Sequence, residues 1–135
     1  MAHIFDKLNL NGHREILVLD SPLSFEKELK LLMGVRISRD LAVVRQFSFA
    51  LVFVAHKTQL DRYSDVIVSK LQGDAVLWFA YPKVTSRNLT CDFNRDNGWD
   101  VIRGAGFDPV RLVAIDADWS ALRFRRKEFI YRRPK

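Results

Sequence analysis

The run Ala75–Ala80 (AVLWFA) constrains the fold of this chain more than any other segment. Consecutive apolar residues without polar alternation predict a β-strand that is covered on both of its faces. Gln72-Gly73 ends the helical pattern that precedes the strand, and Pro82 ends the strand because proline has no N–H for the hydrogen-bond ladder. Such a strand is expected inside a mostly parallel sheet.

Other apolar segments alternate with helical patterns along the chain. This alternation predicts a parallel sheet with right-handed crossovers and helices on both faces, whereas the last two strands are so close in sequence that they must pair antiparallel. The predicted fold class is α/β, a three-layer sandwich whose mostly parallel sheet ends in a C-terminal antiparallel hairpin. Further strands are expected at Ile16–Leu19, Val35–Ser38, Phe49–Ala55, Val110–Ile115 and Trp119–Arg125, and helices at Phe25–Met33 after an N-cap at Ser24, from a cap at Thr58 to Leu71, and at Asp92–Arg103.

The chain of 135 residues is predicted to form a single domain, residues 1–135, with the composition of a soluble globular protein. Cys91 is the only cysteine, so no internal disulfide is expected and a reducing compartment is favoured. The first residues lack the apolar core of a signal peptide, and the longest apolar run, Phe49–Ala55, is far shorter than the roughly 20 residues of a membrane helix. A cytoplasmic protein without a membrane partner is predicted. His3 and His13 lack partners at metal-ligand spacing, which argues against a metal site.

The net charge of +6 lies at one end of the chain. Seven of the 22 basic residues, but only one of the 16 acidic residues, lie between Arg123 and Lys135. A basic tail at about residues 126–135, with aromatic residues between its arginines, is suited to neutralising phosphates and stacking on bases. It is also typical of a solvated terminus, or of a segment that packs on a partner subunit. The nucleic-acid hypothesis depends on Arg125, Arg126, Lys127, Arg132 and Arg133.

Two stretches resemble the class I S-adenosylmethionine-dependent methyltransferases. Leu71–Leu77 is similar to the leucine, glycine-containing turn and apolar strand at the fifth strand of that family, and Ile102–Phe107 is similar to its alanine-glycine-phenylalanine turn. The terminal antiparallel hairpin is also typical of that fold. The resemblance implies a Rossmann-like (methyltransferase-like) sheet with the strand order Val35–Ser38, Ile16–Leu19, Phe49–Val54, Val76–Ala80, Trp119–Arg125 and Val110–Ile115, in which only Trp119–Arg125 is antiparallel.

A longer pattern more specifically resembles a small bacterial family of unknown function, and this resemblance implies no activity. The pattern begins at Tyr81-Pro82-Lys83 and ends with the strand from Trp119 to Arg125. Between these segments it includes Ser86, Asp92, Arg95, Asp96, Gly98 and Trp99.

The chain departs from the methyltransferase pattern where the cofactor would bind. In that family the first strand runs into a glycine-rich loop that lets S-adenosylmethionine approach the backbone, but Leu19–Ser24 (LDSPLS) has no glycine and contains Pro22. Asp40 is the candidate for the family's ribose-binding acidic residue, with Arg39 beside it. One helix–strand unit is also missing after the second strand. No cofactor is therefore expected, and the leading hypothesis is a catalytically reduced methyltransferase-like binding or interaction module.

Open α/β sheets bind ligands at the carboxyl ends of their parallel strands. At the end of the central strand, the Lys83 ammonium is suited to an anionic group to which Ser86 can donate a hydrogen bond. If the loop only closes this edge, Tyr81 packs its ring there instead. We expect a small anionic ligand or a protein partner, with an enzyme acting on a small anionic substrate as an alternative, and the oligomeric state stays open. The candidate ligand-binding residues are Asp20, Ser21, His56, Tyr81, Lys83 and Ser86.

Overall fold

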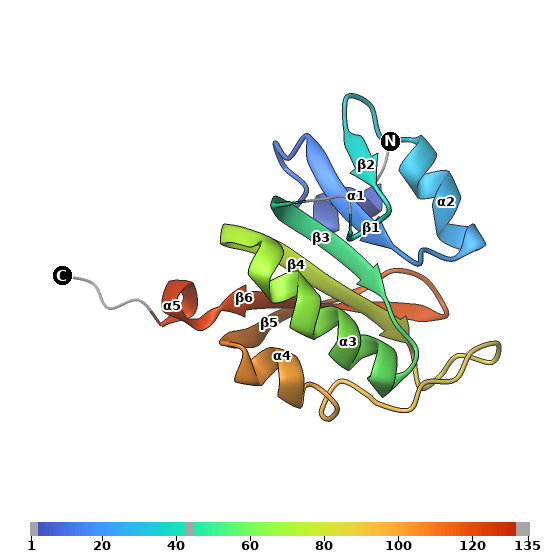
Figure 1. Cartoon of the computed structure of the whole chain (residues 1–135). Helices are drawn as coiled ribbons and strands as arrows, with labels where there is room; N and C mark the ends of the chain where they lie inside the picture. The colour runs from blue at the N-terminus through green and yellow to red at the C-terminus, as the bar shows by residue number, and fades with distance from the viewer. Residues whose placement is uncertain (1–2, 43–44, 132–135) are drawn as a thin grey trace.

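The computed structural model describes residues 3–42 and 45–131. Its six strands form one mixed sheet in the order β2-β1-β3-β4-β6-β5 (Figure 1), which is the order predicted from the sequence. β6 alone runs against the other strands, because it pairs antiparallel with both β4 and β5, as predicted. The strands are β1 (Glu15–Leu19), β2 (Arg36–Ser38), β3 (Phe47–Phe53), β4 (Leu71–Pro82), β5 (Phe107–Ala114) and β6 (Trp119–Arg126).

β4 contains the central apolar run and lies inside the sheet, parallel to β3 and antiparallel to β6. Every residue of Ala75–Pro82 is buried. Burial of both faces explains why this segment lacks polar alternation. β4 begins earlier than predicted, because Leu71 already pairs with Phe47 ahead of a shift in register. Gln72-Gly73 therefore lies within the strand, and the prediction that it ends a helix is wrong.

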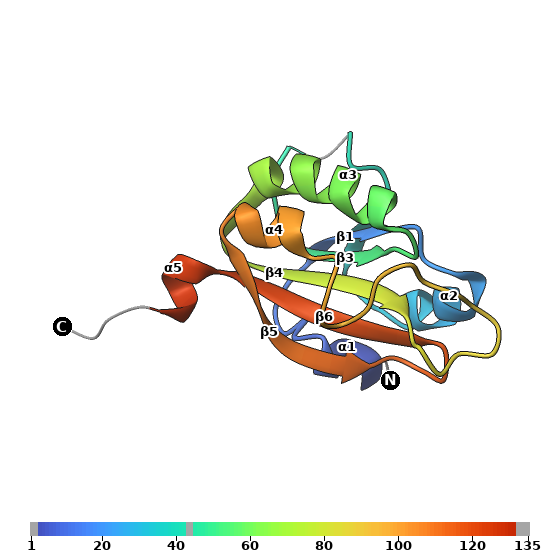
Figure 2. The ribbon, with the colours of Figure 1, turned by 90° about the horizontal axis from the view of Figure 1, so that it is seen from below.

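Helices cover both faces of the sheet and produce the three predicted layers (Figure 2). α3 and α4 pack on one face, and α1 and α2 pack on the other. No helix in the described ranges is long and apolar enough to span a membrane. The helical segments are α1 (His3–Lys7), α2 (Leu23–Lys30), α3 (Lys57–Ile67), the 3-10 turn η1 (Val68–Lys70), α4 (Asp100–Gly104) and α5 (Lys127–Ile130).

Aromatic side chains fill both interfaces between helices and sheet. On the face covered by α3 and α4, the Trp99 ring centroid lies 5.1 Å from that of Phe124 and 6.0 Å from that of Phe79. On the opposite face, Phe53 and Trp119 meet edge to face at 5.1 Å. Buried rings contribute much of the apolar area of a core, so these contacts hold the loop that carries Trp99 firmly on the sheet.

The helix predicted at Asp92–Arg103 is wrong over most of its length, because α4 begins only at Asp100. The preceding loop is held by Asn94. Its side-chain Oδ1 accepts the backbone N–H of Asn97 at 3.2 Å, and its carbonyl oxygen accepts the indole N–H of Trp99 at 2.8 Å. Local bonds of this kind offer the backbone an alternative to the helix and so delay its start.

The predicted helix caps are also wrong. α2 has Pro22 as its N-cap, so Ser24 lies within the helix. α3 has His56 as its N-cap, so Thr58 lies within that helix, and neither N-cap residue makes a side-chain capping bond. The first N–H of α3 is instead met by a carboxylate from the loop before α4, which sequence spacing does not reveal.

Candidate functional site

The parallel strands β1 to β4 end at one edge of the sheet, where the six predicted ligand-binding residues lie. Two of these residues follow β1, one follows β3, and three belong to the end of β4 and the loop behind it. Groups of hydrogen-bonded side chains occupy this edge. Two of the groups begin in the loop after β1, one begins at the residues after β3, and one lies in the loop after β4. The contacts within each group decide which side chains remain free for a ligand.

Asp20 follows β1 with a backbone φ of +57°, a left-handed conformation that glycine adopts easily and that aspartate tolerates better than most residues. Its carboxylate Oδ2 accepts hydrogen bonds from the Tyr63 hydroxyl at 2.5 Å and from Gln59 Nε2 at 3.0 Å. Burial, together with the bond to Asp20, raises the pKa of Tyr63 to about 12, so the phenol remains a donor at neutral pH. Asp20 thus joins the first loop to α3.

Ser21 belongs to a bridge between α2 and the residue after β2. Its hydroxyl donates to Glu26 Oε2 at 2.5 Å, and Arg39 binds both oxygens of the same carboxylate at 2.9 Å. The Arg39 guanidinium, aided by the Ser21 hydroxyl, lowers the pKa of Glu26. Asp40 Oδ1 accepts the backbone N–H of Ala42 at 2.9 Å, within its own turn. The chain segments after β1 and β2 are therefore connected through Glu26.

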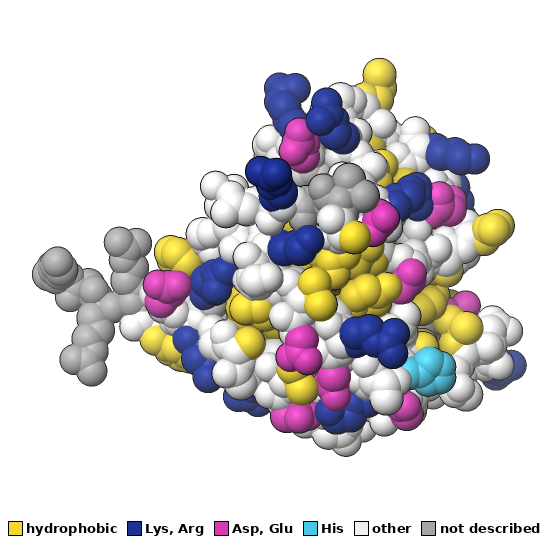
Figure 3. Space-filling view, viewed as in Figure 1, with side chains coloured by type: hydrophobic (Ala, Val, Ile, Leu, Met, Phe, Trp, Pro, Cys, Tyr) yellow, Lys and Arg dark blue, Asp and Glu magenta, His cyan; other side chains and the backbone are white. Residues whose placement is uncertain are grey.

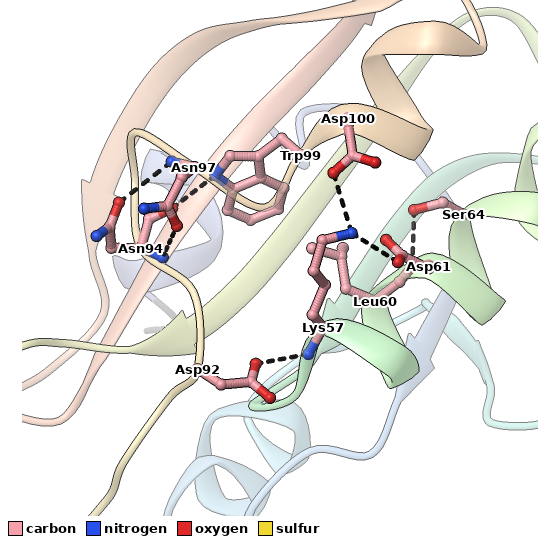
Figure 4. Close-up of polar contacts among 9 residues, drawn as sticks. All are labelled: Lys57, Leu60, Asp61, Ser64, Asp92, Asn94, Asn97, Trp99 and Asp100. Carbon is pink, nitrogen blue, oxygen red and sulfur yellow. Dashed lines mark hydrogen bonds and ion pairs between the residues drawn. The ribbon is translucent and has the colours of Figure 1, made fainter.

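Lys57, after β3, connects α3 to α4 and to the loop before it (Figure 4). Its Nζ lies 2.7 Å from Asp61 Oδ2 and 2.9 Å from Asp100 Oδ1, and its backbone N–H donates to Asp92 Oδ1 at 2.6 Å. The predicted ligand residue His56 lies at the rim of this group, with its Nδ1 3.7 Å from Asp92 Oδ2. Sequence reasoning missed this group, because only the Lys57–Asp61 spacing is a helical pair signal.

The Lys57 group has a structural role, not a catalytic one. The Lys57 ammonium donates hydrogen bonds to the carboxylates of Asp61 and Asp100. These bonds raise the pKa of Lys57, so its ammonium stays charged and is neither a base nor a nucleophile at neutral pH. Within the described ranges, Asp61 Oδ1 is buried without a hydrogen-bond partner. No three histidine, cysteine or acidic side chains of the described residues are placed to hold a metal ion.

Tyr81 is buried at the end of β4, with 5% of its surface exposed. Its ring packs against Phe93 and Trp99, with ring centroids 5.8 and 5.5 Å away. Burial raises the pKa of the Tyr81 phenol, which therefore stays neutral. This is the packing arrangement that the sequence left open as the alternative to ligand binding.

The loop after β4 is tied to the turn between β5 and β6. The Ser86 hydroxyl donates to Asp118 Oδ1 at 2.7 Å and accepts the backbone N–H groups of Asn88 and Leu89 at 3.2 and 3.1 Å. The Ser86 hydroxyl therefore already donates its proton within the fold and has none left to donate to a ligand. The backbone N–H of Lys83 donates to the Asp118 carbonyl at 2.8 Å. The Lys83 side chain is half-buried, and its ammonium makes no hydrogen bond or ion pair with the described residues.

Two of the arginines in the nucleic-acid hypothesis are bound within the fold. Arg125 pairs with both oxygens of Asp74, at 2.8 and 2.6 Å. Arg126 donates to the carbonyls of Leu71 and Gly73 and lies 4.9 Å over the Phe107 ring. Basic and acidic side chains are mixed over the face that carries α3 and α4 (Figure 3). Lys127 is exposed, Arg132 and Arg133 lie outside the described residues, and nucleic-acid binding stays a prediction.

No protein-family model and no curated protein matches the chain, which is consistent with its resemblance to a family of unknown function. Solved structures do match it. The ribosomal protein L11 methylase from Lactobacillus delbrueckii subsp. bulgaricus aligns over 93% of this chain and 77% of its own, at a TM-score of 0.59 and 11% identity. A putative type 11 methyltransferase from Sulfolobus solfataricus aligns over 94% of this chain and 92% of its own, at a TM-score of 0.56 and 10% identity. The fold is that of the class I S-adenosylmethionine-dependent methyltransferases.

This methyltransferase-like fold agrees with the sequence resemblance, including the position of the antiparallel strand β6. A mitomycin 7-O-methyltransferase also matches, over 87% of this chain but only 50% of its own length, at a TM-score of 0.58 and 12% identity. At such identities the likeness shows the fold alone.

Proposed function

We propose that this chain is a methyltransferase-like binding or interaction module that does not use S-adenosylmethionine. The observation that carries the proposal is the loop after β1, which has side chains at Asp20, Ser21 and Pro22 and is connected through the bidentate Glu26–Arg39 pair to the residue after β2. In the family that the sequence resembles, a glycine-rich loop after the first strand and an acidic residue after the second hold the cofactor. In this chain the equivalent segments bind each other.

The residues at these positions do not fit the cofactor. Asp20, Ser21 and Pro22 carry side chains where the family has glycine, and Pro22 has no N–H to donate. Arg39 introduces a cation after β2, and Asp40 Oδ1 is bonded within its own turn. A cofactor in this place would have to displace the charge-assisted bonds of Arg39.

The ionisable groups near this edge favour binding over catalysis. Burial raises the pKa of the Cys91 thiol and of the Tyr81 phenol, and carboxylate partners raise the pKa of Lys57. Each group stays protonated at neutral pH, whereas a nucleophile or general base must be deprotonated. The Lys83 ammonium supports a small anion as the ligand of this edge.

Calorimetric titration of the full chain with S-adenosylmethionine and with S-adenosylhomocysteine tests the first part of the proposal. We expect no saturable heat with either compound, while a class I methyltransferase titrated in parallel binds both. Arg39→Ala opens the Glu26 bridge and is still expected not to bind, because the loop after β1 keeps its side chains. Micromolar binding by the unmodified chain overturns the proposal.

A thermal-shift screen against small anions and nucleotides tests the second part. Lys83→Ala and Arg87→Ala are matched variants, because Arg87 is an exposed cation in the same loop. A ligand of this edge should stabilise the unmodified chain and Arg87→Ala but not Lys83→Ala. Equal stabilisation of the two variants contradicts the role of Lys83, and turnover of the ligand supports the enzyme alternative instead.

A further inference from the structure

A pocket of about 420 Å3 opens between α4 and the edge strand β5. Its floor contains the buried residues Trp99 and Leu122, together with Val110 and Leu112, which are 42% and 44% exposed. α4 has 5 residues against 11 in α3, so it leaves this end of the sheet partly uncovered (Figure 2). The volume is that of a small-molecule site. None of the six candidate residues at the strand ends lines it.

Arginines surround the apolar floor. The side chains of Arg95 and Arg103 are 61% and 57% exposed, and Arg111 lines the pocket from β5. Asp96, 3.5 Å from Arg95, is the one acidic residue among the described residues that line it. Arg103 donates its Nε to Asp108 at 3.2 Å, and its terminal nitrogens have no hydrogen-bond partner in the described part of the chain. The pocket therefore combines an apolar floor with a positively charged rim.

We propose that this pocket binds a small amphipathic carboxylate, with its hydrocarbon part on Leu112 and Leu122 and its carboxylate between Arg95 and Arg103. Contact with the floor removes hydrocarbon from water. Guanidinium groups bind carboxylates through paired charge-assisted hydrogen bonds. A ligand with only one of these two parts uses half of the site.

The edge strand itself argues against a protein strand as the occupant. Pro109 has no N–H to donate to an added strand, and the pairing of β5 shifts register between Pro109 and Arg111. Prolines and bulges are the devices that keep sheet edges from accepting further strands. A small ligand on the face of the sheet avoids both obstacles. This inference does not depend on the proposed function, because it concerns a different place on the molecule.

Octanoate is the probe, followed by amide-correlation NMR of the full chain. We expect saturable shifts at the Trp99 indole and at the Leu112 amide. Octan-1-ol lacks the carboxylate and acetate lacks the hydrocarbon part, so each should bind at least about tenfold more weakly than octanoate. Octyl phosphate tests the headgroup, and binding as tight as that of octanoate overturns the preference for a carboxylate. Absence of octanoate binding, or acetate binding as tightly, overturns the inference.

Three variants locate the site. Arg95→Gln combined with Arg103→Gln removes both charges but keeps side-chain amide donors, and Leu112→Glu introduces a carboxylate at an exposed position. Each should weaken octanoate binding about tenfold or more, whereas Arg87→Gln should bind like the unmodified chain. Equal affinity in all variants overturns the inference.

The residues whose NMR signals shift with octanoate distinguish a failure of this inference from a failure of the proposed function. Octanoate shifts gathered at Asp20 and Lys83 in place of Trp99 would overturn the pocket assignment and leave the proposed function standing. S-adenosylmethionine binding in the calorimetric test would overturn the proposed function and leave the pocket assignment standing.

Discussion

The hydroxyl of Tyr63 donates to the carboxylate of Asp20 across 2.5 Å, and this bond fixes the first loop of the sheet to α3. Asp20 has a positive φ of +57°, at the position where the resembled family has a glycine-rich loop. Aspartate therefore combines two roles here, because it accepts the bond from α3 and also tolerates the left-handed turn.

Substitutions of Asp20 separate these two roles. Asp20→Gly and Asp20→Ala both lose the bond to Tyr63, but only alanine opposes the left-handed backbone. We expect Asp20→Ala to have a free energy of unfolding about 1 kcal/mol lower than that of Asp20→Gly. Asp20→Asn keeps an acceptor and should lie nearest the unmodified chain. Urea titrations followed by tryptophan fluorescence measure the series, and equal stability of the alanine and glycine variants contradicts the prediction.

The raised pKa of Tyr63 predicts a loss of stability at alkaline pH. The phenol has an ordinary pKa of 10.0 and a folded-state pKa of about 12. Its contribution is therefore complete below pH 10 and is lost as the pH rises toward 12, because the unfolded chain releases the proton first. The urea midpoint of Tyr63→Phe should fall less steeply over this window. Gln59→Ala is the control, since it removes the other partner of Asp20 without removing a titrating group, and it should keep the full slope.

The order of the strands could be predicted because each strand is a short apolar segment bounded by turn residues. Parallel strands separated by helices allow few topologies, which local patterns then decide. The apolar run Ala75–Ala80 was correctly predicted to be covered on both faces, since every one of its residues is buried. Local patterns failed in the loop before α4 for two reasons. The local bonds of Asn94 compete with the helix, and the packing of Trp99 on Tyr81 joins chain segments that sequence periodicity does not connect.

The sequence predicts at which edge of the sheet the candidate residues lie, but it does not predict which side chains they bond to. The ends of parallel strands are readable from the sequence, so the six residues were expected at one edge of the sheet, and they lie there. Ligand binding by these residues stays a prediction. Their partners are not readable, because Asp20 bonds to Tyr63, 43 residues away, and Ser86 bonds to Asp118, 32 residues away. The pocket beside α4 was missed for the same reason, since it depends on where that helix begins.

The Arg125–Asp74 pair predicts that the basic segment supports stability. Its bidentate geometry is that of a structural ion pair, although both side chains are 35% exposed. A double-mutant cycle with Arg125→Gln and Asp74→Asn should give a coupling of about 0.5–1 kcal/mol at neutral pH. Arg125 lowers the pKa of Asp74, so the coupling should be present above the ordinary carboxyl pKa and lost as the pH falls through the lowered value. A coupling of zero at neutral pH would leave Arg125 free for a phosphate.

The contact between α1 and the sheet predicts that the indole of Trp78, in the central strand β4, contributes strongly to the free energy of unfolding. Trp78 Nε1 donates to the Leu8 carbonyl at 2.7 Å, and both residues are 0% exposed. Trp78→Phe leaves this carbonyl buried without a partner and should lower the free energy of unfolding by about 2 kcal/mol. Trp119→Phe is the matched control, because the Trp119 indole makes no hydrogen bond within the described residues and loses only ring volume. Urea unfolding followed by circular dichroism should rank Trp78→Phe below Trp119→Phe. Equal losses would mean that apolar contacts, such as those of Phe5, hold α1 without help from the hydrogen bond.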